Sequence, residues 1–377
     1  MQLILWLSAS LILYCYLGYP LILMVLGLFL GKKIKRGEIT PSISLLICAH
    51  NEEKVIENKI KNSLALDYPK DKLEVIVASE SNDKTDEIVE KYKGEGVKLF
   101  AYPKKKGKPY TIYRTLPKCK GKIIIFTDAN AMFRKDAVRK LVRNFNDPRI
   151  GCVSGELKYI NPGNVSIGES EGIYWKYEIL LKRLESKIYS VLGANGSIYA
   201  MRKELYSPLS EYRGDDFDLP IRVAQQGYGV VWEPEAISEE KVYSEAKKAF
   251  KKKIIIVGWH FGGAFLLLKD SVKKFQPLLI FQLISHKILR WMIPFFLILI
   301  FLTNTFLLTN VFYLILFIGQ IVFYSLAILS CCQERKGRKL NKLMNLIHYF
   351  CVVNLAALVG IIKGLLRQQK TTWEKLR

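Results

Sequence analysis

Residues 123–130 read Ile-Ile-Ile-Phe-Thr-Asp-Ala-Asn, a short β-branched and aromatic run followed directly by polar side chains. Such a run is typical of a buried strand. Asp128 and Asn130 stand two residues apart at its end, so their side chains can point the same way and share a hard cation such as Mg²⁺ or Mn²⁺. The spacing equally suits an Asp-x-Asn turn that only caps the next helix, and by itself it leaves both interpretations open.

Three further runs of strand length precede this one, at Ile43–Cys48, Glu74–Ser79 and Val97–Ala101. Helical patterns separate the runs, and the first of these has apolar residues four positions apart at Ile56 and Ile60. Strands that alternate with helices predict a largely parallel α/β sheet. Ligands of such sheets bind at the carboxyl ends of the strands, so the polar residues there are the candidate site.

The residues that follow these strands are polar, but they do not form a glycine-rich nucleotide motif. Ala49-His50-Asn51-Glu52 follows the first run, and Glu80 follows the second. No Gly-x-Gly-x-x-Gly follows a strand, and no Gly-x-x-x-x-Gly-Lys-Ser/Thr occurs. A dinucleotide-dependent dehydrogenase and a P-loop enzyme therefore have no support in this sequence.

The N-terminal segment is apolar and long enough to cross a bilayer. There is no charged residue from Leu3 to Leu30, and a bilayer core needs roughly 20 apolar residues. The segment exceeds the apolar region of a signal peptide, so we expect it to remain as an anchor. Basic residues follow at once, at Lys32, Lys33, Lys35 and Arg36. The positive-inside rule then places the N-terminus outside and the chain after Lys32 in the cytosol.

Three more apolar runs lie near the C-terminus, roughly at Ile293–Phe306, Val311–Cys332 and Leu346–Leu366. We expect the first two to form a hairpin that returns the chain to the cytosol at the basic segment Glu334–Lys342. The third run contains Lys363. It either spans the membrane, which puts the basic tail outside, or lies at the interface, which keeps the tail inside. The loop and the tail are similarly basic, so the positive-inside rule does not choose between the two.

The composition excludes several classes of protein. Of the 377 residues 50% are hydrophobic, which excludes a disordered chain. The seven cysteines form no Cys-x-x-Cys motif and the four histidines are far apart, so we expect reduced packing cysteines and a metal, if any, on oxygen ligands. The net charge of +23 alone fits nucleic acid or an anionic membrane face. Much of it flanks the apolar runs, which favours the membrane and argues against a nucleic-acid partner.

Five short motifs follow one another between Ser42 and Gly262. They are Ser-Leu-Leu-Ile-Cys-Ala-His-Asn-Glu-Glu at 44–53, Gly-Lys at 107–108, Asp-Ala-Asn at 128–130, Gly-Ala-Asn-Gly-Ser-Ile-Tyr-Ala-Met-Arg at 193–202, and Gly-Asp-Asp-Phe-Asp-Leu at 214–219. In this order they resemble glycosyltransferase family 2, the inverting nucleotide-sugar enzymes, and its membrane-embedded branch of cellulose, hyaluronan and poly-N-acetylglucosamine synthases. The resemblance implies a GT-A-like α/β domain with a mostly parallel sheet, flanked by transmembrane helices.

The resemblance also implies where the base of the donor binds. Ala49, His50 and Glu52 stand at the base-contacting positions of the family. Glu80 stands where the family usually has an aspartate against uridine, so the contact with the base is expected to differ.

The diphosphate and the metal of the donor belong, by the same resemblance, to the next two motifs. Lys108 takes the place of the lysine that faces the diphosphate. Asp128 and Asn130 take the place of the family's Asp-x-Asp, and a carboxamide oxygen is also a metal ligand. We therefore expect Asp128 to bind the donor, and Asp128 and Asn130 to hold Mg²⁺ or Mn²⁺.

The last two motifs imply the acceptor site and the catalytic base. The expected acceptor contacts are Gly193, Asn195, Gly196, Ser197 and Asp215. Asp216 takes the position of the family's catalytic base. It would remove the proton from the acceptor hydroxyl.

Two tryptophans are further candidates for the acceptor site. Trp175 could offer a platform for the acceptor, although an aromatic cluster such as Tyr174-Trp175-Lys176-Tyr177 also suits plain packing. Trp259 could offer a face for sugar stacking. Processive members of the family carry Gln-x-x-Arg-Trp here, and Gly258 replaces the arginine, so the sequence leaves processivity open.

These observations predict four regions and one principal function. We expect an anchor at 1–31, a cytosolic GT-A-like domain at 40–243, interfacial helices at 244–286, and a membrane region with a basic tail at 287–377. The predicted function is inverting sugar transfer from a nucleotide sugar, with a UDP-sugar as the expected donor, to a polysaccharide or lipid-linked saccharide at the cytosolic face of the cell membrane. Two alternatives are a single addition to polyprenyl phosphate or another lipid, and a non-catalytic scaffold or nucleotide-sensing subunit.

Overall fold

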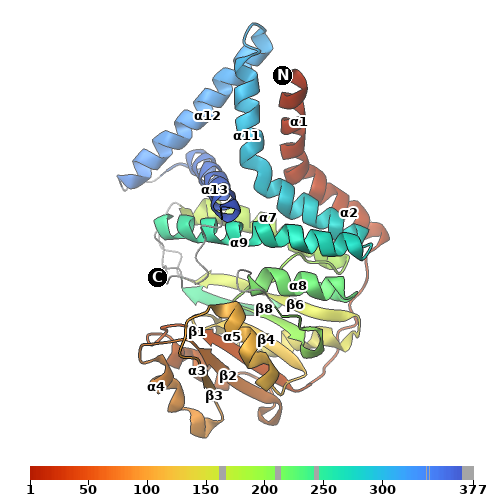
Figure 1. Cartoon of the computed structure of the whole chain (residues 1–377), viewed down its shortest axis with the longest axis vertical. Coiled ribbons are helices and arrows are strands. Elements are labelled where there is room, and N and C mark those ends of the chain that lie inside the picture. The colour runs from red at the N-terminus through yellow and green to blue at the C-terminus, as the bar shows by residue number, and fades with distance from the viewer. Residues whose placement is uncertain (161–166, 209–213, 242–245, 337, 339, 367–377) are drawn as a thin grey trace.

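The computed structural model describes residues 1–160, 167–208, 214–241, 246–336, 338 and 340–366. Within these residues, a sheet domain carries a frame of apolar helices on one side (Figure 1). The sheet domain fills the lower part of Figure 1, and the helices fill the upper part. The basic tail predicted after Leu366 lies outside the described residues.

One half of the sheet is parallel. The whole sheet has the strand order β3-β2-β1-β4-β7-β6-β8-β5. Its parallel half contains β1 (Ile43–Ala49), β2 (Leu73–Ser79), β3 (Lys98–Ala101) and β4 (Ile123–Asp128). These are the strands that the sequence predicts, and the observed ends differ from the expected ones by a single residue.

The other half of the sheet begins with a reversal of direction. It contains β7 (Tyr199–Arg202), β6 (Ile150–Ile160), β8 (Gly229–Lys241) and β5 (Met132–Phe133). Strand β7 is antiparallel to both β4 and β6, β8 is parallel to β6, and β5 is antiparallel to β8. Because β7 starts beside the end of β4, the loop before β7 lies at the carboxyl edge of the parallel half.

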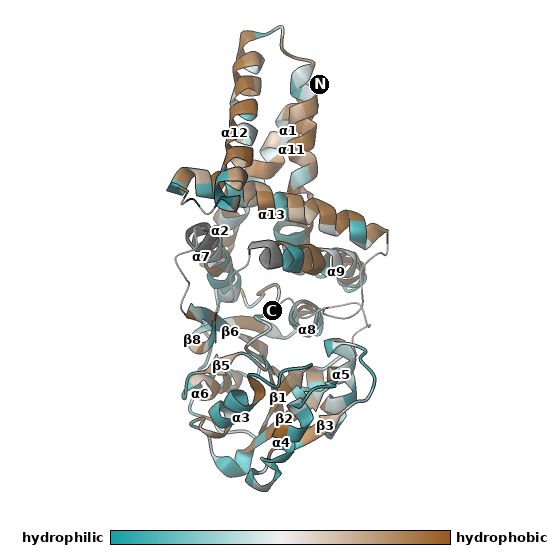
Figure 2. Cartoon of the chain, turned by 90° about the vertical axis from the view of Figure 1, so that its left-hand side faces the viewer, coloured by the Kyte–Doolittle hydropathy of each residue, from teal (hydrophilic) through white to brown (hydrophobic). Residues whose placement is uncertain are grey.

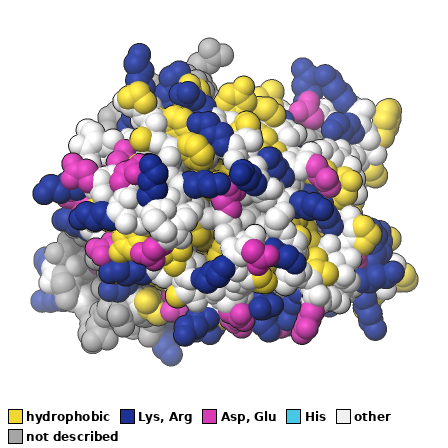
Figure 3. All heavy atoms as spheres, turned by 90° about the horizontal axis from the view of Figure 1, so that it is seen from below, with side chains coloured by type: hydrophobic (Ala, Val, Ile, Leu, Met, Phe, Trp, Pro, Cys, Tyr) yellow, Lys and Arg dark blue, Asp and Glu magenta, His cyan; other side chains and the backbone are white. Residues whose placement is uncertain are grey.

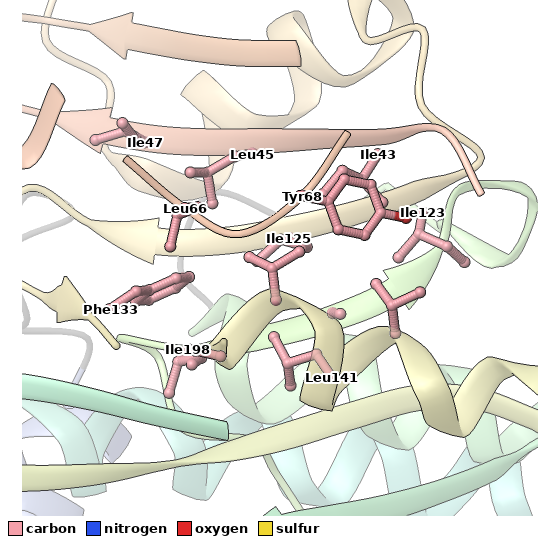
Figure 4. Close-up of a cluster of buried hydrophobic side chains, with 14 of the residues drawn as sticks. Ile43, Leu45, Ile47, Leu66, Tyr68, Ile123, Ile125, Phe133, Leu141 and Ile198 are labelled. Atoms are coloured by element: carbon pink, nitrogen blue, oxygen red, sulfur yellow. The ribbon is translucent and has the colours of Figure 1, made fainter. Parts of the chain in front are cut away.

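Strands β1, β2 and β4 are buried on both faces, whereas the edge strand β3 is only partly buried. Successive residues of a strand point to opposite faces, so Leu45 and Ile47 belong to one core (Figure 4) and Leu46 to the other. Two buried faces explain why these strands are apolar throughout rather than alternating. The helices on the first face are α3 (Ile56–Leu64), α4 (Thr85–Glu90) and α6 (Ala137–Val142), and those on the second are α5 (Lys108–Thr115) and α8 (Asp215–Gln225).

Several helices of the described chain are suited to a membrane by length and composition. The segments are Gln2–Phe29, Phe250–Lys273, Pro277–Thr305, Val311–Glu334 and Lys342–Leu365. Three helices among them rise away from the sheet domain in Figure 1, namely α1 (Gln2–Leu13), α11 (Leu289–Thr305) and α12 (Val311–Arg335). Helix α11 packs against both α1 and α12. Figure 2 shows hydrophobic residues along these helices, most densely on α12.

Two other apolar helices lie across the upright ones. Helix α9 (Ala246–Lys273) runs between the sheet domain and the upright helices in Figure 1, and α13 (Lys342–Leu365) runs across the molecule in Figure 2. They meet closely, because a Cβ added to Gly360 would lie 2.7 Å from the Ile254 carbonyl oxygen and 3.3 Å from the Gly258 nitrogen. The apolar run near the C-terminus therefore does not continue the direction of α11 and α12.

The N-terminal helix is joined to the sheet domain by buried polar contacts. Its second half, α2 (Tyr19–Phe29), packs on α7 (Ile167–Lys187). The Tyr19 hydroxyl donates to Glu185 Oε1 at 2.6 Å, and His286 Nδ1 lies 2.6 Å from the same oxygen. His286 belongs to the short π-helix Leu283–Ile288, which follows α10 (Pro277–Gln282) and leads into α11. The N-terminal helix, the sheet domain and the segment Pro277–Thr305 thus meet at the Glu185 carboxylate.

The surface charge of the sheet domain is mixed. Figure 3 looks at the face farthest from the upright helices and shows Lys and Arg spread over it, with Asp and Glu among them. A face for nucleic acid carries basic residues clustered in a patch or stripe. The view in Figure 3 shows dispersed charges instead.

Candidate active site

The candidate residues gather at the carboxyl edge of the parallel strands. Strands β1, β2 and β4 end there, and helices α5 and α8 begin there. The loop Gly193–Ser197, which precedes the reversed strand β7, completes the edge. Motifs that are far apart in the sequence therefore meet as the predicted topology requires.

Lys108 lies in the middle of an acidic cluster. Its Nζ is 3.0 Å from Asp128 Oδ1 and 3.3 Å from Asp215 Oδ2. Asp215 also accepts a hydrogen bond of 2.7 Å from the Tyr199 hydroxyl. Burial alone lowers the pKa of Lys108, but the two carboxylates outweigh burial and raise this pKa well above its usual range. Lys108 is therefore a fixed positive charge at neutral pH.

Asp216 is the more exposed member of the acidic pair. Its side chain is 36% exposed, whereas the Asp215 side chain is 6% exposed. Asp216 Oδ1 lies 3.9 Å from His260 Nε2 on α9, and a Cβ added to Gly196 would lie 2.9 Å from Asp216 Oδ2. Burial raises the pKa of Asp216, and Lys108 opposes this rise. The glycine leaves the approach to the carboxylate open.

Glu80 holds the segment that precedes Lys108. Its Oε2 accepts hydrogen bonds from the backbone N–H groups of Lys106 at 3.0 Å and Gly107 at 2.8 Å. The Glu80 carbonyl oxygen lies 2.7 Å from His50 Nδ1. The other carboxylate oxygen, Oε1, is buried and has no hydrogen-bond partner among the residues described. Glu80 thus shapes this edge, and its role in binding the base stays a prediction.

Ala49 and Glu52 fix the turn after the first strand through their backbones. Ala49 is buried at the end of β1, and its carbonyl oxygen accepts a hydrogen bond of 3.0 Å from the Glu80 N–H. The Glu52 N–H donates to Thr85 Oγ1 at 2.8 Å. Both residues therefore lie where the sequence predicts a base contact, and that role stays a prediction.

Asp128 and Asn130 have the chemistry of a divalent-cation site. Asn130 Oδ1 is buried and lacks a hydrogen-bond partner within the described chain. In that same part of the chain, no group of three or more His, Cys, Asp and Glu side chains is placed to hold a metal. A cation here would take oxygens from Asp128 and Asn130 and complete its octahedron with phosphate and water oxygens. The residues present fit that arrangement, and the metal stays a prediction.

The loop Gly193–Ser197 is fixed against α8. Gly193 has a φ of +96°, a left-handed conformation that glycine adopts without strain. The Ala194 N–H then donates to the Asp216 carbonyl oxygen at 2.6 Å. Ser197 Oγ donates to Asn195 Oδ1 at 3.1 Å, while Asn195 Nδ2 is buried and has no partner in the described residues. The loop is therefore held in place by its own contacts and by α8, and one amide donor in it has no partner among the described residues.

The two candidate tryptophans lie differently with respect to this cluster. Trp259 is buried on α9 and directly precedes His260, the neighbour of Asp216. The Trp175 ring lies 6.2 Å from the Tyr159 ring, between centroids, and Lys182 Nζ lies 5.7 Å from the Trp175 centroid. Neither Tyr159 nor Lys182 is a candidate site residue. The role of Trp175 as an acceptor platform stays a prediction without a contact that joins it to the cluster.

Two residues of the cluster were not predicted from the sequence. Tyr199 lies inside the motif 193–202, and its hydroxyl on β7 donates to Asp215 at the start of α8. His260 is a single polar ring in an apolar stretch of α9, stacked on Phe217 with 4.6 Å between centroids. A polar ring within an apolar run was the available signal. The partners become visible only when β7 and α9 are placed beside α8.

The curled, mostly parallel sheet with a reversed strand and an acidic carboxyl edge defines a GT-A-like glycosyltransferase fold. Residues 44–209 match the model of Glycosyl transferase family 2, so the chain carries a family 2 glycosyltransferase domain. The match confirms the fold class and the family that the sequence motifs predict.

Two relatives extend this result. Probable glycosyltransferase YdaM of Bacillus subtilis (strain 168) is 29% identical over 259 residues, which cover 63% of this chain and 58% of that protein. Poly-beta-1,6-N-acetyl-D-glucosamine synthase of Staphylococcus aureus (strain COL) is 25% identical over 235 residues, which cover 60% of this chain and 56% of that protein. The chain thus spans a little over half the length of these relatives. The family 2 domain and the names of the relatives both support a transferase.

A solved structure shares the fold over nearly the whole chain. It is mannosyltransferase PcManGT from Pyrobaculum calidifontis in complex with GDP-Man and Mn²⁺, with a TM-score of 0.72 and 19% sequence identity. The match covers 97% of this chain and 100% of that chain. The common fold therefore includes the helical frame as well as the sheet domain.

Proposed function

We propose that the protein transfers a sugar from a nucleotide sugar, with a UDP-sugar as the first donor to test, to a saccharide or lipid-linked acceptor at the cytosolic membrane face. The observation that carries this proposal is the cluster at the carboxyl edge of the sheet. There Lys108 pairs with Asp128 and Asp215, beside the more exposed Asp216. A cation for a diphosphate and a carboxylate for an acceptor proton thus lie next to each other.

The donor side of the site must stabilise a departing diphosphate. Lys108 supplies a fixed positive charge, and its place at the start of α5 adds the partial positive charge of a helix N-terminus. A divalent cation at Asp128 and Asn130 supplies Lewis-acid stabilisation when bound. The Oε1 atom of Glu80 is available to accept an N–H group of the base. These contacts orient the sugar toward Asp216.

The acceptor side of the site must remove one proton. The acceptor hydroxyl gives its proton to the Asp216 carboxylate while its oxygen bonds to the anomeric carbon. The bond from that carbon to the diphosphate oxygen breaks in the same step, and its electron pair leaves with the diphosphate. One displacement inverts the anomeric centre. Asn195 Nδ2, which has no partner among the described residues, would supply a donor to a sugar oxygen.

The arrangement of the helices supports a cytosolic sheet domain. The basic residues from Lys32 to Arg36 lie between the first apolar helix and β1, at the sheet-domain end of that helix. The hairpin of α11 and α12 returns the chain toward the same side, and α13 then lies across the bundle. We infer that Leu346–Leu366 is interfacial.

A single addition to a lipid acceptor is the second candidate, and the position of α9 favours it. This helix brings His260 to within 3.9 Å of Asp216 and exposes Phe265 and Leu266 farther along. A lipid acceptor could place its head group at Asp216 and its tail along the apolar surface of α9, without a channel. An extruding synthase would need a lumen through the bilayer.

Transfer assays separate these functions. The full chain in lipid nanodiscs is incubated with labelled UDP- and GDP-sugars and Mn²⁺, with either an oligosaccharide primer or polyprenyl phosphate. A long saccharide supports a polymerising enzyme, and one sugar on the lipid supports the second candidate. Absence of transfer with every donor and acceptor would overturn both proposals and favour a non-catalytic subunit.

A further inference from the structure

Lys59 is a fully buried lysine on α3, directly behind the proposed metal site. Its exposed fraction is 0%. The Nζ atom donates to Thr127 Oγ1 at 2.9 Å and to the Ala131 carbonyl oxygen, and it lies 4.1 Å from the centroid of the Phe133 ring. Burying an ammonium group is costly, and α3 needs only an apolar side chain here to fill its core face. Core packing alone therefore does not explain why a lysine is buried at this position.

The two hydrogen-bond acceptors of Lys59 stand on either side of the metal turn. Thr127 precedes Asp128, and Ala131 follows Asn130. One amino group thus ties together both ends of the segment that presents the two candidate ligands. It does so from the interior of the domain, where Lys59 is fully buried.

A second residue of α3 extends the same clamp. Asn62 Nδ2 donates to the Phe133 carbonyl oxygen at 2.9 Å, and the Phe133 N–H donates to Asn62 Oδ1 at 2.8 Å. Helix α3 therefore holds the backbone at Phe133, just after the turn, as well as at the two ends of the turn. Without these contacts the backbone between β4 and β5 could relax toward other conformations.

The hydroxyl of Thr127 also connects the metal turn to the acceptor loop. Thr127 Oγ1 donates to the Ser197 carbonyl oxygen at 2.9 Å. A hydroxyl has one proton and two lone pairs, so Thr127 can donate to Ser197 while it accepts from Lys59. The chain of contacts runs from α3 through the turn to the loop that faces Asp216.

We propose that Lys59 is a positioning residue that holds the turn Asp128–Ala131 in the shape that presents the Asp128 carboxylate and the Asn130 amide oxygen to a divalent cation. This inference rests on the proposed function, because it assumes that the cation binds there. The interior partner of a ligand-bearing segment orients the ligands without touching the metal.

The chemistry of the amino group suits this role in either charge state. Burial lowers the pKa of Lys59 to about 7, although the Asp128 carboxylate opposes this shift. Both the ammonium and the neutral amine carry the N–H groups that the two hydrogen bonds need. The clamp is therefore geometric and persists whether or not the group is protonated.

Direct metal binding tests the proposal. Mn²⁺ is titrated into the full chain in nanodiscs and followed by electron paramagnetic resonance, for the wild type, Lys59→Met and Lys61→Met. Lys61 is the matched control, since it lies on the same helix and pairs at the surface with Glu57. We expect Lys59→Met to weaken Mn²⁺ binding by about 10- to 100-fold, as loss of an outer-shell partner does, and Lys61→Met to bind like the wild type.

A second pair of variants keeps the test decisive if Lys59→Met does not fold. Thr127→Val removes the hydroxyl, and Thr127→Ser keeps it, so we expect weakened Mn²⁺ binding in the first and wild-type binding in the second. Folded Lys59→Met or Thr127→Val protein that binds Mn²⁺ like the wild type would overturn the positioning role alone. A wild-type chain that binds no Mn²⁺ would instead overturn the proposed metal site, and the inference with it.

Discussion

Asp215 and Asp216 are neighbours in the sequence, but their surroundings suit them to different tasks. Asp215 is buried and engaged by the Tyr199 hydroxyl and Lys108. Asp216 is 36% exposed and faces Gly196. A carboxylate that must meet an acceptor hydroxyl needs that opening, whereas one that fixes a lysine does not. We therefore propose Asp216 as the base and Asp215 as the residue that fixes Lys108, and the predicted acceptor contact of Asp215 stays a prediction.

The first prediction separates the two acids kinetically. Asp216→Asn should lower kcat by about 10²- to 10⁴-fold, the usual contribution of a general base, and leave the KM for the donor nearly unchanged. Asp215→Asn should instead raise the donor KM, because Lys108 loses one of its two carboxylate partners. Steady-state kinetics of both variants measure the difference. If Asp216→Asn transfers sugar at the wild-type rate, Asp216 is not the general base.

The second prediction concerns the pH dependence of transfer. Burial raises the pKa values of both Asp216 and Asp215, and Lys108 opposes the rise. Since only the ionised base accepts a proton, kcat/KM should fall as the pH drops through the raised value and level off above it. The fall in kcat/KM at low pH reports the titration of Asp215 and Asp216 as a pair, because adjacent interacting acids titrate together. A profile that stays flat down to the ordinary aspartate pKa of about 3.9 would contradict this prediction.

The residues at the centre of the cluster that the sequence predicted belong to contiguous motifs. Lys108, Asp128 and Asp216 each stand inside such a motif and meet at one edge, as the alternation of strands and helices implies. Tyr199, His260 and Lys59 act through partners that are distant in sequence. Their contacts depend on the reversal at β7 and on the packing of α9 and α3, which no local pattern specifies.

At the scale of the elements, strands were easier to predict than the direction of apolar helices. Buried parallel strands are short and apolar throughout, so β1 to β4 stand out from their flanks. Hydropathy alone fits both a spanning and an interfacial helix for α13. Its direction depends on the close approach to α9 at Gly360, a tertiary contact. The position of β6 between β7 and β8 likewise depends on the tertiary fold.

The third prediction tests the crossing of α9 and α13. Gly360→Leu would place a Cβ 2.7 Å from the Ile254 carbonyl oxygen, so the helices must separate. We expect a loss of about 1–3 kcal/mol in the free energy of unfolding, the usual cost of overpacking. Gly319→Leu on α12 is the matched control, because a Cβ there meets nothing within 4 Å. Thermal unfolding in nanodiscs compares them, and equal stability of the two variants would rule out a tight crossing.

At the scale of the whole molecule, the membrane frame and the site form one unit. Glu185 on α7 accepts from the Tyr19 hydroxyl of the anchor and from the Leu192 N–H, which directly precedes Gly193 of the acceptor loop. His286 contacts the same carboxylate from the segment before α11. The buried Glu185 carboxylate therefore connects the N-terminal helix and the segment before α11 to the loop that faces Asp216. We therefore expect the N-terminal helix to order the site as well as to hold the protein at the membrane.

The last prediction follows from this connection. Tyr19→Phe removes one hydrogen bond from the buried Glu185 carboxylate, which should cost about 1–3 kcal/mol of unfolding free energy and lower kcat by loosening the acceptor loop. Tyr313→Phe is the control, because the Tyr313 hydroxyl accepts a hydrogen bond of 3.3 Å from the Trp6 indole N–H and lies on α12, outside the sheet domain. Transfer rates and melting temperatures of both variants are compared in the same nanodiscs. If the frame serves only to hold the enzyme at the membrane, Tyr19→Phe will keep the wild-type kcat. A lower kcat in Tyr19→Phe alone shows that the anchor helps to order the site.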